Sequence, residues 1–214
     1  MNNHALLWLR RVALPVLLCM TLLLGACFGA ILDPGPAPTR LALAPALPAP
    51  MAGAATDKQL VVAMPVCGSE LDNDRIATVF AGREIRYLGD TRWTSSVPVL
   101  LRTTIIEALE ATGGLRGVGD ELAGLASDAR LLTDLRKFAL YYESENAAPV
   151  AAFEASFRLL NLRDGKVMAS LTVSEKAGAT GHEKADLARA MEAALQQALA
   201  KLAPWTLQEM RRLK

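Results

Sequence analysis

Hydrophobic and polar residues alternate most clearly in two neighbouring segments of the chain. Every second residue is apolar in residues 151–159, the same pattern returns in residues 167–174, and Asp164-Gly165 lies between them. Alternation with a period of two is typical of a strand with one buried face, and Asp-Gly is a favoured hairpin turn. The two segments therefore predict an antiparallel hairpin that is covered on one side. The expected inward residues are Ala151, Phe153, Ala155, Phe157, Leu159, Val167, Ala169, Leu171 and Val173.

Two other segments carry apolar residues at the spacing of an amphipathic helix. The first follows Ser95-Ser96, has Pro98 in its first turn and ends before Gly113-Gly114, which are favourable start and stop signals. The second opens with a capping-box pattern at residues 180–183 and is expected to stop at Pro204. The predicted buried stripes are Val97, Leu101, Ile105, Ala108, Leu109 and Thr112, then Leu187, Met191, Ala194, Leu195, Ala198 and Leu202.

Shorter apolar segments complete the predicted sheet. Residues 60–64 form a run that stops at Pro65, and residues 76–80 and 83–88 flank a second hairpin turn.

Residues 122–142 fit either a helix or a strand. Helical spacing passes through Leu122, Leu125, Leu132 and Leu135, whereas alternation passes through Phe138, Leu140 and Tyr142, with Leu131, Thr133 and Leu135 on the other phase. The pattern as a whole predicts an α+β fold, with a largely antiparallel or mixed sheet and two amphipathic helices on one face.

The N-terminal residues predict the compartment. Arg10-Arg11 precede a mostly apolar stretch, residues 12–24, which is too short to cross a bilayer core of about 30 Å as a helix. The stretch ends in Leu24-Gly25-Ala26-Cys27, which resembles a bacterial lipobox. In a lipobox the cysteine thiol accepts a diacylglyceryl group, and a peptidase then cuts the chain before the cysteine. The alternative is an ordinary signal peptide that is cut after Ala26, with Cys27 following by chance. By resemblance to Gram-negative lipoproteins, Phe28 rather than Asp after the cysteine favours the periplasmic face of the outer membrane.

Composition shifts divide the chain into four parts. Residues 1–26 are a lipoprotein signal peptide, and residues 27–57 form a lipidated tether that holds six of the eleven prolines, a composition that favours extended backbone. Residues 58–207 form the folded domain, and residues 208–214 are a basic tail.

The net charge and the few reactive side chains argue against several classes of function. The formal net charge is +1, and removal of Arg10-Arg11 with the signal makes it −1, which argues against nucleic acid as a partner. Cys67 becomes the one free thiol, either a small buried hydrophobe or half of an intermolecular disulfide. His182 is the one histidine left and is expected to be an exposed helix-cap residue. The acidic residues 70–74 predict a solvated turn with Asp–Arg pairing rather than a calcium loop, and glycines 113–119 lack the spacing of a dinucleotide site.

Several short motifs occur in an order that resembles one family. They are residues 60–65 (LVVAMP), residues 71–76 (LDNDRI), Tyr87, Arg92-Trp93, Pro98 to Leu101, residues 129–138 (ARLLTDLRKF) and Trp205. Together with the lipobox they resemble the ABC-type transport auxiliary lipoproteins, including the paraquat-inducible protein C type, over roughly residues 60–206. The resemblance favours a strand for residues 129–142. The strand that the family usually has soon after the lipidated cysteine is represented at best by residues 39–43.

This resemblance implies a non-catalytic subunit of a lipid-transport system. In the family, an ABC transporter lies in the inner membrane and MCE-domain proteins form a periplasmic tunnel, which the lipoprotein docks to the outer membrane. The implied partners are that tunnel protein, its transporter and, through acyl chains on Cys27, the outer membrane; self-association stays open. A lipid-binding carrier is the alternative and would need an empty apolar cavity. We expect no catalytic residues, cofactor or metal, and a structural role for Arg92 and Trp93.

Overall fold

The computed structural model describes residues 37–51, 53, 55–144 and 147–213. The predicted signal peptide and the predicted lipidation site Cys27 lie outside these residues. Within the described part, the chain from Thr39 onward is one compact unit.

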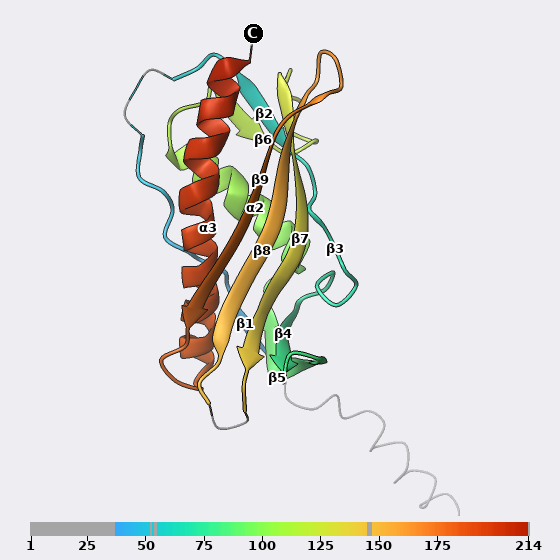
Figure 1. The fold of residues 1–214 in the computed structure, drawn as a ribbon, viewed down its shortest axis with the longest axis vertical. Coiled ribbons are helices and arrows are strands. Elements are labelled where there is room, and N and C mark those ends of the chain that lie inside the picture. Colours follow the sequence, from blue (N-terminus) through green and yellow to red (C-terminus); the bar gives the residue numbers. More distant parts are fainter. Residues whose placement is uncertain (1–36, 52, 54, 145–146, 214) are drawn as a thin grey trace, which may run out of the picture. The chain divides into compact units, whose positions relative to one another are not determined.

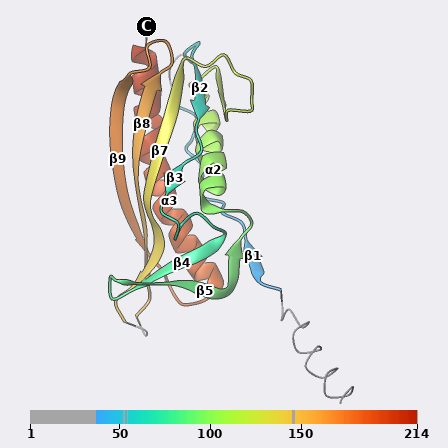
Figure 2. The same cartoon turned by 90° about the vertical axis from the view of Figure 1, so that its right-hand side faces the viewer.

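The unit has an α+β fold, as predicted, with a mixed nine-stranded sheet and two helices (Figures 1 and 2). In chain order the elements are β1 (Thr39–Leu41), β2 (Gln59–Val62), β3 (Val66–Cys67), β4 (Arg75–Phe80), β5 (Glu84–Trp93), α2 (Val97–Ala111), β6 (Gly117–Gly119), β7 (Ala129–Tyr142), β8 (Val150–Asn161), β9 (Val167–Gly178) and α3 (Lys184–Arg212).

Strand β7 is the centre of the sheet. Along one edge it pairs with β8, antiparallel and over nearly its whole length, and β9 continues the sheet beyond β8. Along the other edge β2, β3 and β4 pair with β7 one after another, all parallel to it. One end of β7 therefore lies beside β2, and its other end lies beside β4 (Figure 1).

The ambiguous segment is a strand over residues 129–142, and a β-bulge explains its mixed pattern. The register with β8 shifts between Leu135 and Lys137, so one extra residue changes which phase of the alternation faces the core. Residues from both phases are consequently buried: Leu131, Thr133 and Leu135 before the bulge, and Phe138 and Leu140 after it. The strand that the family resemblance favoured is confirmed.

The core lies between the inner face of the sheet and the two helices. The predicted stripe of α2 is buried in full, and Phe153 and Phe157 of β8 are each 1% exposed. One predicted inward residue, Val167, is instead 51% exposed. A second register shift, between Leu159 and Leu160 of β8, turns that end of β9 away from the core.

Helix α3 differs from its prediction at both ends. It begins at Lys184 with Glu183 as N-cap, three residues later than the capping box suggests, and Thr180 donates a 3.0 Å hydrogen bond to Asp186 instead. Pro204 does not stop the helix, which continues to Arg212. A proline inside a helix removes a hydrogen bond at a cost of about 3 kcal/mol. Burial of Leu207 and Met210 beyond it extends the packed face and offsets that cost. Residues 208–212, predicted as a tail, therefore belong to α3.

The second half of the predicted tether packs on the domain. Strand β1 pairs in parallel with the end of β5, and Pro45 is buried. The amides of Met51 and Thr56 donate 3.0 Å hydrogen bonds to the carbonyls of Thr112 and Gly114. A proline-rich segment with little charge can satisfy its few amides this way while Leu41 and Leu43 pack against the core. The prediction of a free tether is wrong for residues 39–57.

Candidate functional site

The acidic turn before β4 is a structural junction. The Asp74 carboxylate pairs with Arg92, at 3.1 Å, and with Arg40 of β1, at 3.6 Å. Asp–Arg pairing was predicted for this turn, but the arginines come from other strands. The Asp74 carbonyl also accepts a 2.7 Å hydrogen bond from the Trp93 amide. The turn thus ties β1 and β5 together at the start of α2.

Trp93 and its neighbours close one end of the core. The indole is fully buried and stacks on Phe138, with ring centroids 6.1 Å apart, and Phe138 meets Phe153 edge-to-face at 6.0 Å. A ring that is out of reach of solvent cannot contact a partner protein. The structural role predicted for Trp93 therefore agrees with its position.

The glycines after α2 serve packing. Gly113 has φ +64°, the left-handed conformation that ends a helix, and a Cβ on Gly114 would lie 2.7 Å from the Leu207 side chain of α3. Gly117 and Gly119 belong to β6, which pairs with β2. Helix termination, close packing and strand pairing therefore explain these glycines, and no nucleotide-binding role is needed to explain them.

Neither His182 nor the cysteine sits in a reactive cluster. His182 is exposed ahead of α3, as expected. Among the described residues, no three His, Cys, Asp or Glu side chains gather at metal-binding distances. Cys67 is half-buried against the core. Burial raises the pKa of its thiol, and the charges of Asp72 and Glu70 raise it further.

Cys67 should consequently react slowly with electrophiles. The thiolate is the nucleophile, so a raised pKa leaves less of it at neutral pH. We expect iodoacetamide to alkylate the folded protein more slowly than it alkylates glutathione at pH 7.5, with a rate that keeps rising as the pH passes the ordinary thiol pKa. Mass spectrometry measures both, and the urea-unfolded chain is the control. Alkylation of the folded protein as fast as glutathione would contradict this assignment.

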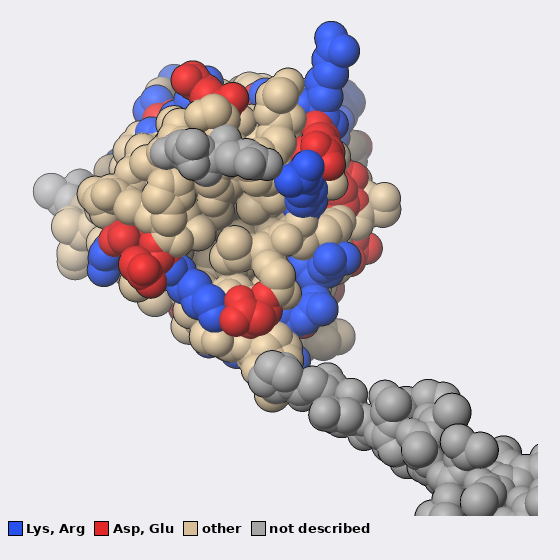
Figure 3. Space-filling view, turned by 90° about the horizontal axis from the view of Figure 1, so that it is seen from below, with Lys and Arg blue, Asp and Glu red and all other residues tan. Residues whose placement is uncertain are grey.

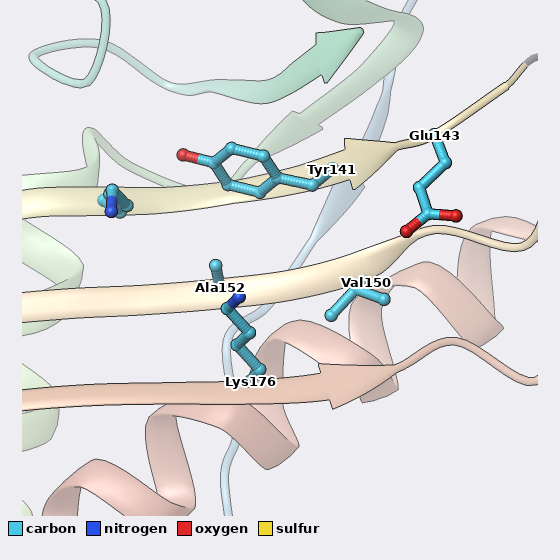
Figure 4. A pocket seen from close by; sticks show the side chains of 6 residues that line it. Tyr141, Glu143, Val150, Ala152 and Lys176 are labelled. Carbon is cyan, nitrogen blue, oxygen red and sulfur yellow. The ribbon is translucent and has the colours of Figure 1, made fainter. Parts of the chain in front are cut away.

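The outer face of the sheet, opposite the helices, carries a surface recess near the end of β7. Its volume is about 250 Å³, and Figure 4 shows its lining side chains on three adjacent strands. The lining residues are Lys137, Tyr141, Glu143, Val150, Ala152 and Lys176. Lys137 donates a 2.7 Å hydrogen bond to Glu154, which raises the pKa of Lys137, and burial raises the pKa of Tyr141.

This recess is large enough for a side chain of another protein but small for a typical small-molecule ligand. Its volume falls below the roughly 300–1,000 Å³ of typical ligand pockets, and it opens along the sheet surface. Of the two lysines that line the recess, Lys137 is already paired with Glu154, whereas Lys176 has no ion pair among the described residues. The arrangement can accept one or two side chains of another protein. Sequence reasoning missed these residues because the bulge hides which phase of β7 faces outward.

The face of the molecule that Figure 3 shows has no large area of one charge sign. Seen from the end that carries β4 and β5, basic and acidic side chains are interspersed around an uncharged, hollowed centre (Figure 3). Such mixed charge gives little attraction for a polyanion. In the described part of the chain, no helix has both the length and the apolar character needed to cross a membrane.

Comparison with known proteins places the chain in a family. The family model for the ABC-type transport auxiliary lipoprotein component matches residues 41–203. A crystal structure of a Xanthomonas campestris protein is similar, with 27% identity, a TM-score of 0.72 and coverage of 81% of this chain and 98% of that one. An uncharacterized protein has 13% identity, a TM-score of 0.63 and coverage of 80% and 99%, and thus shows the same fold. No curated protein matches. The chain belongs to the family of ABC-type transport auxiliary lipoprotein components.

Proposed function

We propose that the protein is a non-catalytic outer-membrane lipoprotein that docks the MCE-type tunnel of an ABC lipid-transport system to the outer membrane. The observation that carries this proposal is the family match over residues 41–203. The match supports a transport auxiliary lipoprotein, and the tunnel partner is our extension of it.

The lipobox supplies the anchor. Acyl chains on Cys27 would hold the protein at the membrane, since each buried methylene contributes about 0.8 kcal/mol. Only the eleven residues 28–38 separate this cysteine from β1. Fully extended, the chain from Cys27 to Thr39 spans at most about 43 Å. The domain would therefore stay close to the bilayer, and a partner would have to come to it.

Packing favours docking over the alternative of a lipid carrier. A carrier needs an empty apolar cavity, whereas the space between sheet and helices is filled by large side chains such as Phe153, Phe157 and Met191, each 1% exposed. The recess of Figure 4 lies on the outer face and is too small for an acyl chain together with a headgroup.

Pull-down from envelope membranes tests the proposal. The tagged wild-type protein should co-isolate the MCE-domain tunnel protein, and the Cys27→Ser variant should recover much less, because it is no longer held at the membrane. Recovery of phospholipid without any tunnel protein would instead favour the carrier.

A further inference from the structure

A second recess lies at the opposite end of the outer face, around Arg130 near the start of β7. Its volume is about 280 Å³. Arg130 points outward, because its neighbours Ala129 and Leu131 are fully buried in the core, and it lies opposite Val61 of β2 and Leu160 of β8. The remaining lining residues are Asp120, Glu121, Leu125, Ser127 and Leu162.

Arg130 is half-buried without an acceptor. Its Nε and the hydroxyl of Ser127 are buried, and neither has a hydrogen-bond partner among the described residues. The acids nearby are engaged elsewhere: Asp120 and Glu121 both pair with Arg102, at 3.3 and 3.7 Å. Taking the Nε–H of Arg130 and the Ser127 hydroxyl out of water without giving them a hydrogen-bond partner is unfavourable. Two orphaned donors in one recess therefore indicate an oxygen ligand that comes from outside the chain.

Apolar side chains surround this arginine. Leu132 and Leu160 are half-buried on the outer face, Leu162 is 39% exposed, and Val167 is 51% exposed. Leu122, in the loop that borders the recess, is 89% exposed. We call the set Arg130, Leu132, Leu160, Leu162, Val167 and Leu122 the Arg130 patch. Exposed apolar residues around a half-buried arginine are typical of a protein–protein interface.

The patch lies far from the end at which the chain enters the domain. Strand β1 pairs with β5, β5 pairs with β4, and β4 pairs with the last residues of β7, up to Tyr142. From Arg130 to Tyr142 the strand rises about 40 Å. If the predicted lipid anchor holds the β1 end of the domain near the bilayer, the patch at the other end can face the periplasm.

We propose that the Arg130 patch docks the periplasmic tunnel protein, and that Arg130 and Ser127 receive a carboxylate of that partner, flanked by apolar side chains. This inference rests on the proposed function and names its surface. A carboxylate can accept two parallel hydrogen bonds from the N–H groups of a planar guanidinium. A polyanion or an anionic bilayer fits less well, because Asp120 and Glu121 line the same recess and would repel a dense array of phosphates.

The test compares variants of the full-length acylated protein, held in nanodiscs, for binding to the purified MCE-domain tunnel protein. Arg130→Gln and Leu160→Asp should each weaken binding about 10- to 100-fold, and Arg130→Lys should restore part of it. Arg136→Gln is the matched control, since Arg136 lies on the same strand and is exposed beside Asp134. Thermal unfolding should be unchanged or slightly later for Arg130→Gln, because the arginine has no partner in the free protein to lose.

Any one of the following results would overturn the inference. If wild type binds and both variants bind equally well, the surface is wrong while the docking function stands. If wild type does not bind the tunnel protein, the proposed function fails and this surface fails with it. If the variants alter only self-association in sedimentation, the patch belongs to a second copy. A large fall in melting temperature for Arg130→Gln would show that Arg130 is a structural residue.

Discussion

Replacing Trp93 with alanine should lower the free energy of unfolding by about 3–5 kcal/mol. The indole is 0% exposed and stacks on Phe138, so truncation leaves a cavity where β5, β7 and the start of α2 meet. Urea unfolding of the mature chain without its acyl chains, followed by circular dichroism, measures the change. The expected loss is a large part of the 5–15 kcal/mol that holds a typical domain together.

Trp93→Phe is the matched control. Its ring can keep the stacking on Phe138, and the indole Nε1 makes no hydrogen bond among the described residues, so the variant should lose only about 1–2 kcal/mol. If Trp93→Ala cost under about 1 kcal/mol while tunnel binding disappeared, Trp93 would be an interface anchor and its assigned role would be wrong.

Cys27→Ser should release the protein from membranes without unfolding its domain. The predicted diacylglyceryl group would be attached to the Cys27 thiol, which serine lacks, and the compact unit begins only at Thr39. Flotation of envelope membranes measures attachment, and circular dichroism measures folding. Mass spectrometry of the wild type should find a diacylated N-terminal Cys27, whereas an unmodified N-terminus would contradict the assignment.

Two truncations locate the start of the domain. A chain that begins at Ala37 should keep the wild-type circular dichroism spectrum and melting temperature. A chain that begins at Asp57 should melt earlier, because it lacks β1 and the hydrogen bond from Met51 to Thr112. Equal melting temperatures would show that residues 39–56 contribute nothing to stability.

Local patterns predicted the elements whose faces are uniformly buried or exposed. The stripe of α2 and most of the hairpin of β8 and β9 follow from periodicity and turn residues alone. The exception in the hairpin is Val167, where a register shift with β8 reverses the predicted face. Strand β7 was ambiguous because a bulge changes its phase, and a bulge depends on the partner strand. Tertiary packing also carried α3 through Pro204 and held residues 39–57 on the domain, which local propensity could not foresee.

The candidate sites likewise combine features that the local sequence predicts with features that depend on tertiary structure. A turn with Asp–Arg pairing could be predicted from the acidic residues 70–74. The arginines that pair with Asp74, Arg92 and Arg40, lie on strands far away in the sequence, so the local pattern could not name them. Arg130 could not be singled out, since its lack of a partner depends on Arg102 engaging Asp120 and Glu121. The identity of the family came from the order of motifs, which individual residues do not specify.

Association with the tunnel protein is the most direct test of the account. The purified lipoprotein and the purified MCE-domain tunnel protein are mixed at micromolar concentration and run together on size exclusion. We predict that they co-migrate as one complex, and that the lipoprotein alone shows no esterase, phosphatase or ATPase activity. Failure to associate, with the lipoprotein extracting phospholipid by itself, or a robust hydrolytic rate that disappears in a His182 variant, would contradict the docking function.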